Sequence, residues 1–209
     1  MNGIAENPFG QPLAEQTKII QSLGKIYTSL YYIDLATGRF AELSSITDIH
    51  AHIGSEGDAQ ERLNYFCHHL MAPEYTEEML SFVALSTLDE RLTGTRIITK
   101  EYQSILFPDR ETGNTRTWRE CSFIECDRNS DGKLAHVIFT TQSIHDAKIK
   151  ELEAQKRLRE TNDELAALLA AEKQHTAIIG AMSNVFFGLY YIDLKENTFQ
   201  EIISRDELH

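Results

Sequence analysis

The alternation of apolar and polar residues divides most of the chain into strands and short helices. Segments with period-two alternation, rich in β-branched and aromatic residues, predict five strands at residues 30–35, 39–43, 95–107, 115–127 and 133–144. Apolar residues spaced three and four apart predict helices at residues 14–26, 57–70 and 74–85, with one further short helix ending before Gly94. This order predicts an α+β fold: a five-stranded antiparallel sheet with the short helices of residues 57–92 across one face.

An internal repeat links the two ends of the chain. Residues 19–50 align without gaps with residues 178–209, at an offset of 159, with 12 identities in 32 positions. Both copies contain Leu-Tyr-Tyr-Ile-Asp-Leu. The turn residue Gly38 becomes Asn197 in the second copy, and glycine and asparagine are the residues that most readily adopt positive φ. Residues 178–209 are therefore predicted to be the first helix and hairpin of a second, truncated domain of the same kind.

The segment between the two copies predicts a long helix. Residues 146–176 contain no glycine or proline and are rich in Ala, Leu, Glu, Lys and Gln, which are strong helix formers. A heptad frame runs through the apolar seam residues Leu158, Leu165, Leu168 and Ile179. Because other seam positions are polar, the frame predicts a weak parallel coiled coil that joins consecutive domains of a homodimer. The alternative is a solvated helix that packs on its own domain.

Several motifs, in their order along the chain, resemble those of the PAS sensor family. They are the Tyr-Tyr-Ile-Asp-Leu strand with its turn, Trp118 in the penultimate strand, the turn at residues 131–133, and the strand at residues 137–141 that runs toward a charged helix. Many PAS domains carry Asp-Ile-Thr at this exit, and here only Ile144 matches it. The resemblance extends over residues 19–146 and 178–209, particularly to PAS-like domains of bacterial diguanylate cyclases and sensor histidine kinases.

The resemblance also implies where a ligand would bind. Ligands of PAS-like folds lie between the sheet and the short helices, which would place the lining at Tyr32, Phe66, Met79, Phe82 and Trp118. The alternative is that these aromatic and apolar side chains form an ordinary core, because aromatic residues dominate cores whatever the function.

Composition and charge favour a cytoplasmic protein that does not bind nucleic acid. The net charge of -12 repels nucleic acid and anionic lipid surfaces. Three cysteines cannot all pair, which is typical of reduced thiols in a cytosol. No segment approaches the length of about 18 apolar residues that a membrane span needs, so no membrane contact is expected from this chain.

No cofactor can be named from the sequence. A PAS-type flavin photoreceptor carries its reactive cysteine in Asn-Cys-Arg-Phe, which this chain lacks. Cys67, His68 and His69 are adjacent, so on a helix they cannot all face one metal or haem iron. The calcium-like loop starting at Asp127 has Ile138 where a bidentate glutamate is required, which favours a plain hairpin turn.

These observations predict four segments and two alternative functions. The segments are a flexible N-terminal tail at residues 1–13, a PAS-like domain at 14–145, a helical linker at 146–177, and the start of a second domain at 178–209. The chain lacks catalytic motifs and is expected not to be an enzyme. It is either a sensory and dimerisation module that signals through the linker to an absent output domain, or a ligand-free scaffold that sets dimer geometry and domain spacing.

Overall fold

The structure is a computed structural model that describes residues 13–107, 113, 115–183 and 188–204. It divides into two compact units, Met1–Ile149 and Lys150–His209, which are described separately. The predicted N-terminal tail at residues 1–13 lies almost entirely outside the described residues. The predicted boundary between the domain and the linker, at residues 145 and 146, falls close to this division.

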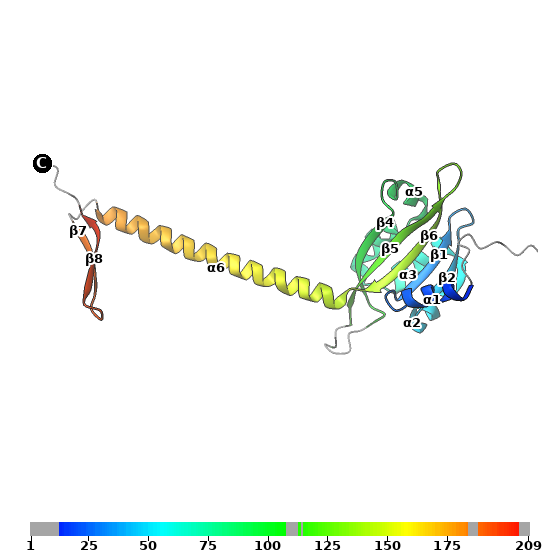
Figure 1. The fold of residues 1–209 in the computed structure, drawn as a ribbon, viewed down its shortest axis with the longest axis horizontal. Coiled ribbons are helices and arrows are strands. Elements are labelled where there is room, and N and C mark those ends of the chain that lie inside the picture. The colour runs from blue at the N-terminus through cyan, green and yellow to red at the C-terminus, as the bar shows by residue number, and fades with distance from the viewer. Residues whose placement is uncertain (1–12, 108–112, 114, 184–187, 205–209) are drawn as a thin grey trace, which may run out of the picture. The chain divides into compact units, whose positions relative to one another are not determined.

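The first unit is built on one antiparallel sheet with the order β3-β2-β1-β6-β5-β4 (Figure 1). Its strands are β1 (Ser29–Asp34), β2 (Arg39–Ser45), β3 (Glu56–Asp58), β4 (Ile97–Ser104), β5 (Thr117–Arg128) and β6 (Leu134–Ser143). The α+β fold and the five predicted strands are confirmed. The sheet has a sixth strand, β3, in place of the predicted start of a helix at residue 57. Its sequence Glu-Gly-Asp has no apolar residue, so no alternation could indicate it.

Short helices connect the two halves of the sheet. They are α2 (Thr47–Ile53), α3 (Ala59–His69), α4 (Thr76–Phe82) and α5 (Leu88–Arg91), with single 3-10 turns at Pro73–Tyr75 and Leu85–Thr87. The side chain of Asp58 accepts a hydrogen bond from the Glu61 backbone N–H at 2.8 Å, which fixes the start of α3. The helix α1 (Leu13–Leu23) precedes the sheet and confirms the first predicted helix.

The core lies between the sheet and these short helices. Because strand side chains alternate between faces, one face of each strand supplies the core, and we call this the inner face. The core brings together buried side chains of the inner face and of α3, chiefly Tyr31, Ile33, Leu63, Phe66, Phe123, Val137 and Phe139. The opposite, outer face carries the remaining side chains of the strands.

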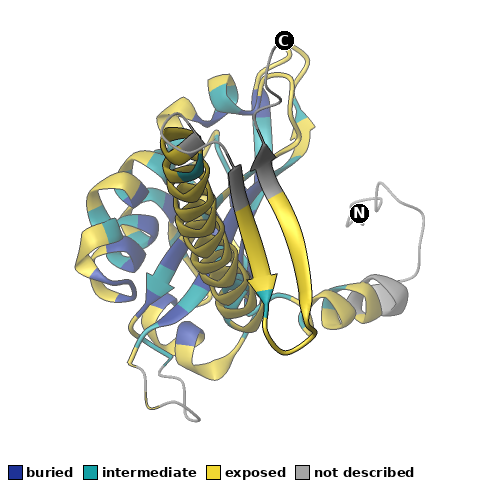
Figure 2. Cartoon of the chain, turned by 90° about the vertical axis from the view of Figure 1, so that its left-hand side faces the viewer, coloured by how far each residue is buried: buried dark blue, intermediate teal, exposed yellow. Residues whose placement is uncertain are grey.

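The helix α6 (His145–Ser183) confirms the predicted linker helix and extends beyond it. It continues through the predicted boundary at residues 177 and 178, so the second repeat has no separate first helix. Residues 150–178 of α6 are all exposed within the single chain (Figure 2). Packing against the described residues therefore gives α6 no support along most of its length.

The second unit ends in a hairpin of β7 (Gly188–Asp193) and β8 (Thr198–Ser204) that matches the hairpin of β1 and β2 residue by residue. Subtracting the offset of 159 from each β7–β8 pair gives the pair at the same place in β1–β2: Gly188 faces Ser204 as Ser29 faces Ser45. Even the register irregularity recurs, after Leu30 and after Leu189. The two repeats therefore share a hairpin, while the assignment of residues 178–209 to the truncated start of a second domain stays a prediction.

Candidate functional site

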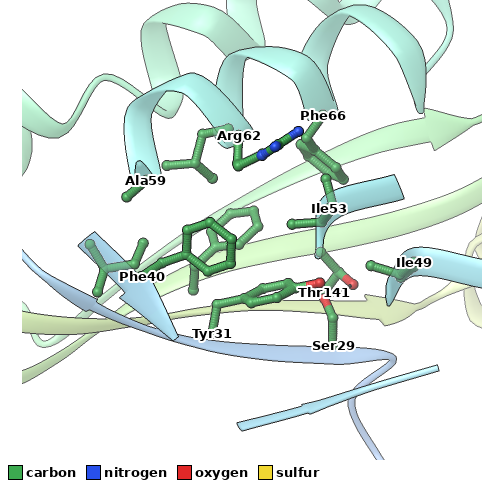
Figure 3. Close-up of a pocket in the computed structure, with 12 residues that line it drawn as sticks. Ser29, Tyr31, Phe40, Ile49, Ile53, Ala59, Arg62, Phe66 and Thr141 are labelled. Carbon is green, nitrogen blue, oxygen red and sulfur yellow. Dashed lines mark hydrogen bonds between the residues drawn. The ribbon is translucent and has the colours of Figure 1, made fainter. Parts of the chain in front are cut away.

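A small cavity lies between the inner face and the helices α2 and α3 (Figure 3). Its volume, measured as the space open to the centre of a water-sized sphere, is about 20 Å³. A single water molecule needs roughly 10–15 Å³ by this measure. The lining consists of Ser29, Tyr31, Ile33, Phe40, Ile49, Ile53, Ala59, Arg62, Leu63, Phe66, Phe139 and Thr141. The core side chains thus fill most of the space in which the sequence predicted a ligand.

The cavity has hydroxyl groups on its sheet side. The Ser29 and Thr141 hydroxyl oxygens lie 2.7 Å apart, and both residues are buried. In such a pair one hydroxyl donates to the other, so the second hydroxyl hydrogen has no acceptor within the pair. Tyr31 also lines the cavity, and burial raises its pKa to about 12. The Tyr31 hydroxyl donates to the Ser45 hydroxyl at 3.5 Å, so the remaining hydroxyl hydrogen of the Ser29–Thr141 pair is the one that can bind an acceptor oxygen.

Arg62 on α3 is the one charged residue of the lining. It is half-buried, and among the described residues no hydrogen bond or ion pair holds its guanidinium group. Since the lining contains no carboxylate, the cavity would favour a neutral or anionic occupant over a cation.

Of the five residues predicted to bind a ligand, the structure places only Phe66 at the cavity. Its ring makes edge-to-face contacts with Tyr102 and Phe139, at centroid distances of 5.4 and 5.7 Å. Met79 is fully buried, and Phe82 packs at 5.7 Å from Phe123, but neither lines the cavity. These two residues belong to the core around the cavity.

Tyr32 and Trp118 lie on the outer face instead, because each occupies the alternate position to an inner-face neighbour. Tyr32 stacks on His136 at 5.1 Å, and the adjacent Tyr31 takes the place at the cavity. Sequence reasoning missed Tyr31 because residues 30–33 are all apolar, which leaves the phase of the strand undefined. It also missed the hydroxyls of Ser29 and Thr141. Ser29 lies two residues before Tyr31, and therefore on the same face of β1, and Thr141 pairs with Ser29 across the strands. This spacing would have been the signal.

Trp118 belongs to a second site, the junction between the sheet and α6. Its backbone carbonyl accepts from the Ile144 N–H at 3.2 Å, and its backbone N–H donates to the His145 ring nitrogen Nδ1 at 3.2 Å. Lys148, in the first turn of α6, places its Nζ 5.7 Å from the centroid of the Trp118 ring. The same Nζ lies 2.8 Å from the Glu101 carboxylate on β4. The first turn of α6 is therefore fastened to two neighbouring strands.

The predicted seam of α6 is solvent-exposed in the single chain. Leu158, Leu165 and Leu168 are 63%, 53% and 68% exposed, and Ile179 is half-buried. Burial within one chain therefore does not explain these apolar residues, and the coiled coil stays a prediction.

Two further kinds of feature, metal-binding clusters and membrane-spanning helices, are absent from the described residues. No group of three or more His, Cys, Asp or Glu side chains within that part of the chain could hold a metal ion. Over the same residues, no helix combines the length and the apolar character needed to cross a bilayer.

Comparison with known proteins gives similar structures only. No family model matches the chain, and no curated protein matches it either. Among solved structures, a sensory box histidine kinase/response regulator from Burkholderia thailandensis is 15% identical, with 71% of this chain and 97% of that chain covered and a TM-score of 0.40. The N-terminal domain of a diguanylate cyclase with a PAS/PAC sensor from Marinobacter aquaeolei is 15% identical, with 57% and 97% covered and a TM-score of 0.37. A PAS domain from Colwellia psychrerythraea is 12% identical, with 61% and 98% covered and a TM-score of 0.33.

Proposed function

We propose that the first unit is a PAS-like sensory module that passes a change in its sheet to α6, and through α6 to an output domain outside this chain. The observation that carries this proposal is the junction at Trp118. A single residue of β5 contacts Ile144 and His145 through its backbone and Lys148 through its ring. Any shift of β5 relative to β4 would therefore act on the first turn of α6, since Lys148 also binds Glu101.

The proposal includes a stimulus that reaches the sheet through the cavity. Ser29 and Thr141 connect the cavity to β1 and β6, and Thr141 lies four residues before His145. Because the cavity is water-sized, an organic ligand would have to displace side chains such as Phe66. Displacement of these side chains would move the strands that pack against them, so that ligand binding would change the conformation of the sheet.

The second candidate is a ligand-free scaffold that sets dimer geometry and domain spacing. The small volume of the cavity favours it, because a core that its own side chains fill has no need of a ligand. Both candidates are binding or structural roles, and we propose no catalysis by this chain.

We extend the proposal to the output domain, the cellular location and the self-association of the module. The similar structures include parts of a histidine kinase and a diguanylate cyclase by name, and we propose an output of one of these two kinds. We place the protein in the cytoplasm because its three cysteines are free thiols. We further propose that two chains associate through the exposed seam of α6.

Two measurements test the sensory role. Native mass spectrometry of the purified chain would show a retained small molecule and the oligomeric state together. Hydrogen exchange of the amides of residues 145–149 would then be compared between the wild type, Ala59→Val, which narrows the cavity, and Ala72→Val, a buried alanine outside its lining. The sensory module predicts that Ala59→Val changes exchange at α6 and that Ala72→Val does not. No retained molecule and equal exchange in all three proteins would favour the scaffold.

A further inference from the structure

Arg119 is a buried cation on the inner face of β5. It is 4% exposed and occupies a core position, in phase with the buried Cys121 and Phe123. A guanidinium group keeps its charge at any pH at which the protein is folded. A buried charge without a counter-charge is strongly unfavourable, so buried arginines are normally paired with an anion.

The described contacts of Arg119 do not include an anion. Its Nη2 donates to the Thr28 hydroxyl, and its guanidinium carbon lies 4.5 Å from the ring centroid of Phe107. Burial raises the pKa of the neighbouring Tyr102, and the charge of Arg119 and a hydrogen bond from its guanidinium group to the Tyr102 hydroxyl offset part of that increase. Its Nε is buried and has no hydrogen-bond partner among the described residues.

Arg128, on the same strand, differs from Arg119 in having carboxylate partners. Arg128 contacts the carboxylates of Asp89 and Glu125, at 2.7 and 2.9 Å, and it lies near the surface. Arg119 is the more deeply buried of the two arginines, yet no carboxylate of the described residues pairs with it. The positive charge of Arg119 therefore has no counter-charge among the described residues.

Hydroxyl groups gather at the same end of the inner face. Across the strands, Arg119 pairs with Ser143 and Cys121 pairs with Thr141, so Thr141 is a diagonal neighbour of Arg119 on one face. Ser29 bonds to the Thr141 hydroxyl and follows directly on Thr28, which binds the guanidinium group. One hydroxyl hydrogen of the Ser29–Thr141 pair has no acceptor within that pair.

We propose that this end of the inner face binds a small oxyanion, of the size and charge of a carboxylate group, with Arg119 as its anchor. Carboxylate oxygens accept strong, charge-assisted hydrogen bonds from a guanidinium group and further bonds from hydroxyls. The bound oxyanion would supply both the counter-charge and the missing partner of Nε. Arg119 follows directly on Trp118, so the anion would bind one residue from the junction with α6.

The inference deepens the proposed function, because it gives the chemical class of a stimulus. The anion site and the relay to α6 can nevertheless be disproved separately. Binding of the anion is measured at Arg119, whereas relay is measured at residues 145–149. An anion that binds and leaves the exchange of those amides unchanged would support the site and contradict the relay.

The test uses the whole chain with sodium acetate and sodium phosphate as probes, at an ionic strength held constant with sodium chloride. We expect acetate or phosphate to raise the unfolding temperature of the wild type with saturation. The increase should disappear in Arg119→Met. It should persist in Arg39→Met, the loss of an exposed guanidinium group outside the lining of the cavity.

A second measurement covers the case in which Arg119→Met does not fold. The Nε–Hε signals of the arginines in wild-type protein labelled with ¹⁵N are followed during titration with acetate. We expect one signal to shift with saturation and to be the signal that is absent from Arg119→Lys. If no Nε–Hε signal shifts and neither acetate nor phosphate changes the unfolding temperature, the proposal is wrong.

A further variant tests whether a carboxylate of the chain itself is the counter-charge of Arg119. Asp109 and Glu111 lie between β4 and β5 in the sequence, outside the described residues. The proposal predicts that Asp109→Asn with Glu111→Gln leaves the response to acetate intact. If this double variant instead creates a response that the wild type lacks, the counter-charge of Arg119 comes from the chain itself, and the proposal is overturned.

Discussion

Asp34 and Asp193 form the same turn in the two hairpins. The Asp34 carboxylate accepts from the backbone N–H groups of Ala36 and Thr37, at 2.8 and 3.1 Å. The Asp193 carboxylate accepts from the N–H groups two and three residues further on, at 2.9 and 3.2 Å. Each turn then reaches a residue with positive φ, Gly38 at 68° and Asn197 at 49°. The repeat thus conserves the chemistry of the turn as well as the strands.

Replacing Asp34 with alanine should lower the free energy of unfolding of the first unit by about 1 kcal/mol, the usual value of a lost hydrogen bond. Hydrogen bonds from Thr37 and then Ala36 lower the pKa of Asp34. This stabilisation is therefore present above the normal pKa of aspartate and is lost as the pH falls through the lowered, folded-state value. Urea unfolding of the wild type and the variant at pH 7 and below pH 3 should show a difference that shrinks with acid.

Asp193→Ala is the matched control for this variant. Its turn has the same hydrogen bonds but belongs to the second unit. The main unfolding transition of the first unit should therefore not move. Equal destabilisation by both variants would mean that the two units unfold as one.

The sequence predicted the strands of the sheet from their β-branched and aromatic residues and, in the long strands, from alternation, and it missed β3, where both signals are lacking. The strand β3 is Glu-Gly-Asp, and α2 offers only Ile49 and Ile53 as a helical signal over seven residues. Tyr32 was expected at the ligand site because the four apolar residues of β1 leave its phase undefined. Arg119 could not be foreseen in the core, since arginine is almost never fully buried.

Phe66→Ala should lower the free energy of unfolding by about 3–5 kcal/mol, because it removes a buried aromatic side chain and enlarges the cavity. Tyr32→Ala is the control on the outer face, where only the stacking on His136 is lost, and should cost about 1 kcal/mol or less. Chemical denaturation monitored by circular dichroism measures both. A larger effect of Tyr32→Ala would contradict the assignment of the two faces.

The three thiols should react at different rates with a thiol reagent at pH 8. Cys67 and Cys121 are buried, and burial raises the pKa of both, that of Cys67 to about 12. Both should stay unmodified in the native protein, since the thiolate is the reactive form. Cys126 is exposed and should react first, although partial burial raises its pKa as well. Rapid modification of all three thiols without denaturant would mean that the core opens.

Glu101→Gln should loosen the first turn of α6 with little loss of global stability. It removes the charge opposite Lys148, and partly exposed ion pairs contribute roughly 0–1 kcal/mol. Amide exchange at residues 145–149 should accelerate, while the buried strands β5 and β6 keep their protection. Glu78→Gln, which breaks the ion pair with Lys100 on the same strand, is the control and should leave those amides unchanged.

Removing residues 150–209 should convert a dimer into a monomer while the first unit stays folded. The truncation point follows Ile149, where the first unit ends, and it retains Lys148 with its contacts to Glu101 and Trp118. The expectation depends on two sets of exposed apolar residues in the removed part. One is the seam of Leu158, Leu165 and Leu168; the other is the β7–β8 hairpin, whose Tyr190, Tyr191, Ile192 and Phe199 are 54–76% exposed.

The equivalent residues of the first hairpin show what such a face requires. Tyr31, Ile33 and Phe40 are 4%, 1% and 5% exposed, because the core covers them, whereas their counterparts Tyr190, Ile192 and Phe199 lack that cover in the described chain. An isolated two-stranded hairpin is at best marginally stable in water, so association that covers this face or the seam should be favourable.

Sedimentation equilibrium of the whole chain, the truncated chain and the double variant Leu165→Asn with Leu168→Asn separates the two surfaces. Dissociation by the asparagine variant would assign the dimer to the seam, and dissociation by truncation alone would assign it to the hairpin. A truncated chain that dimerises with undiminished affinity would contradict the proposal and place association in the first unit, where Ile19 and Ile26 are also exposed.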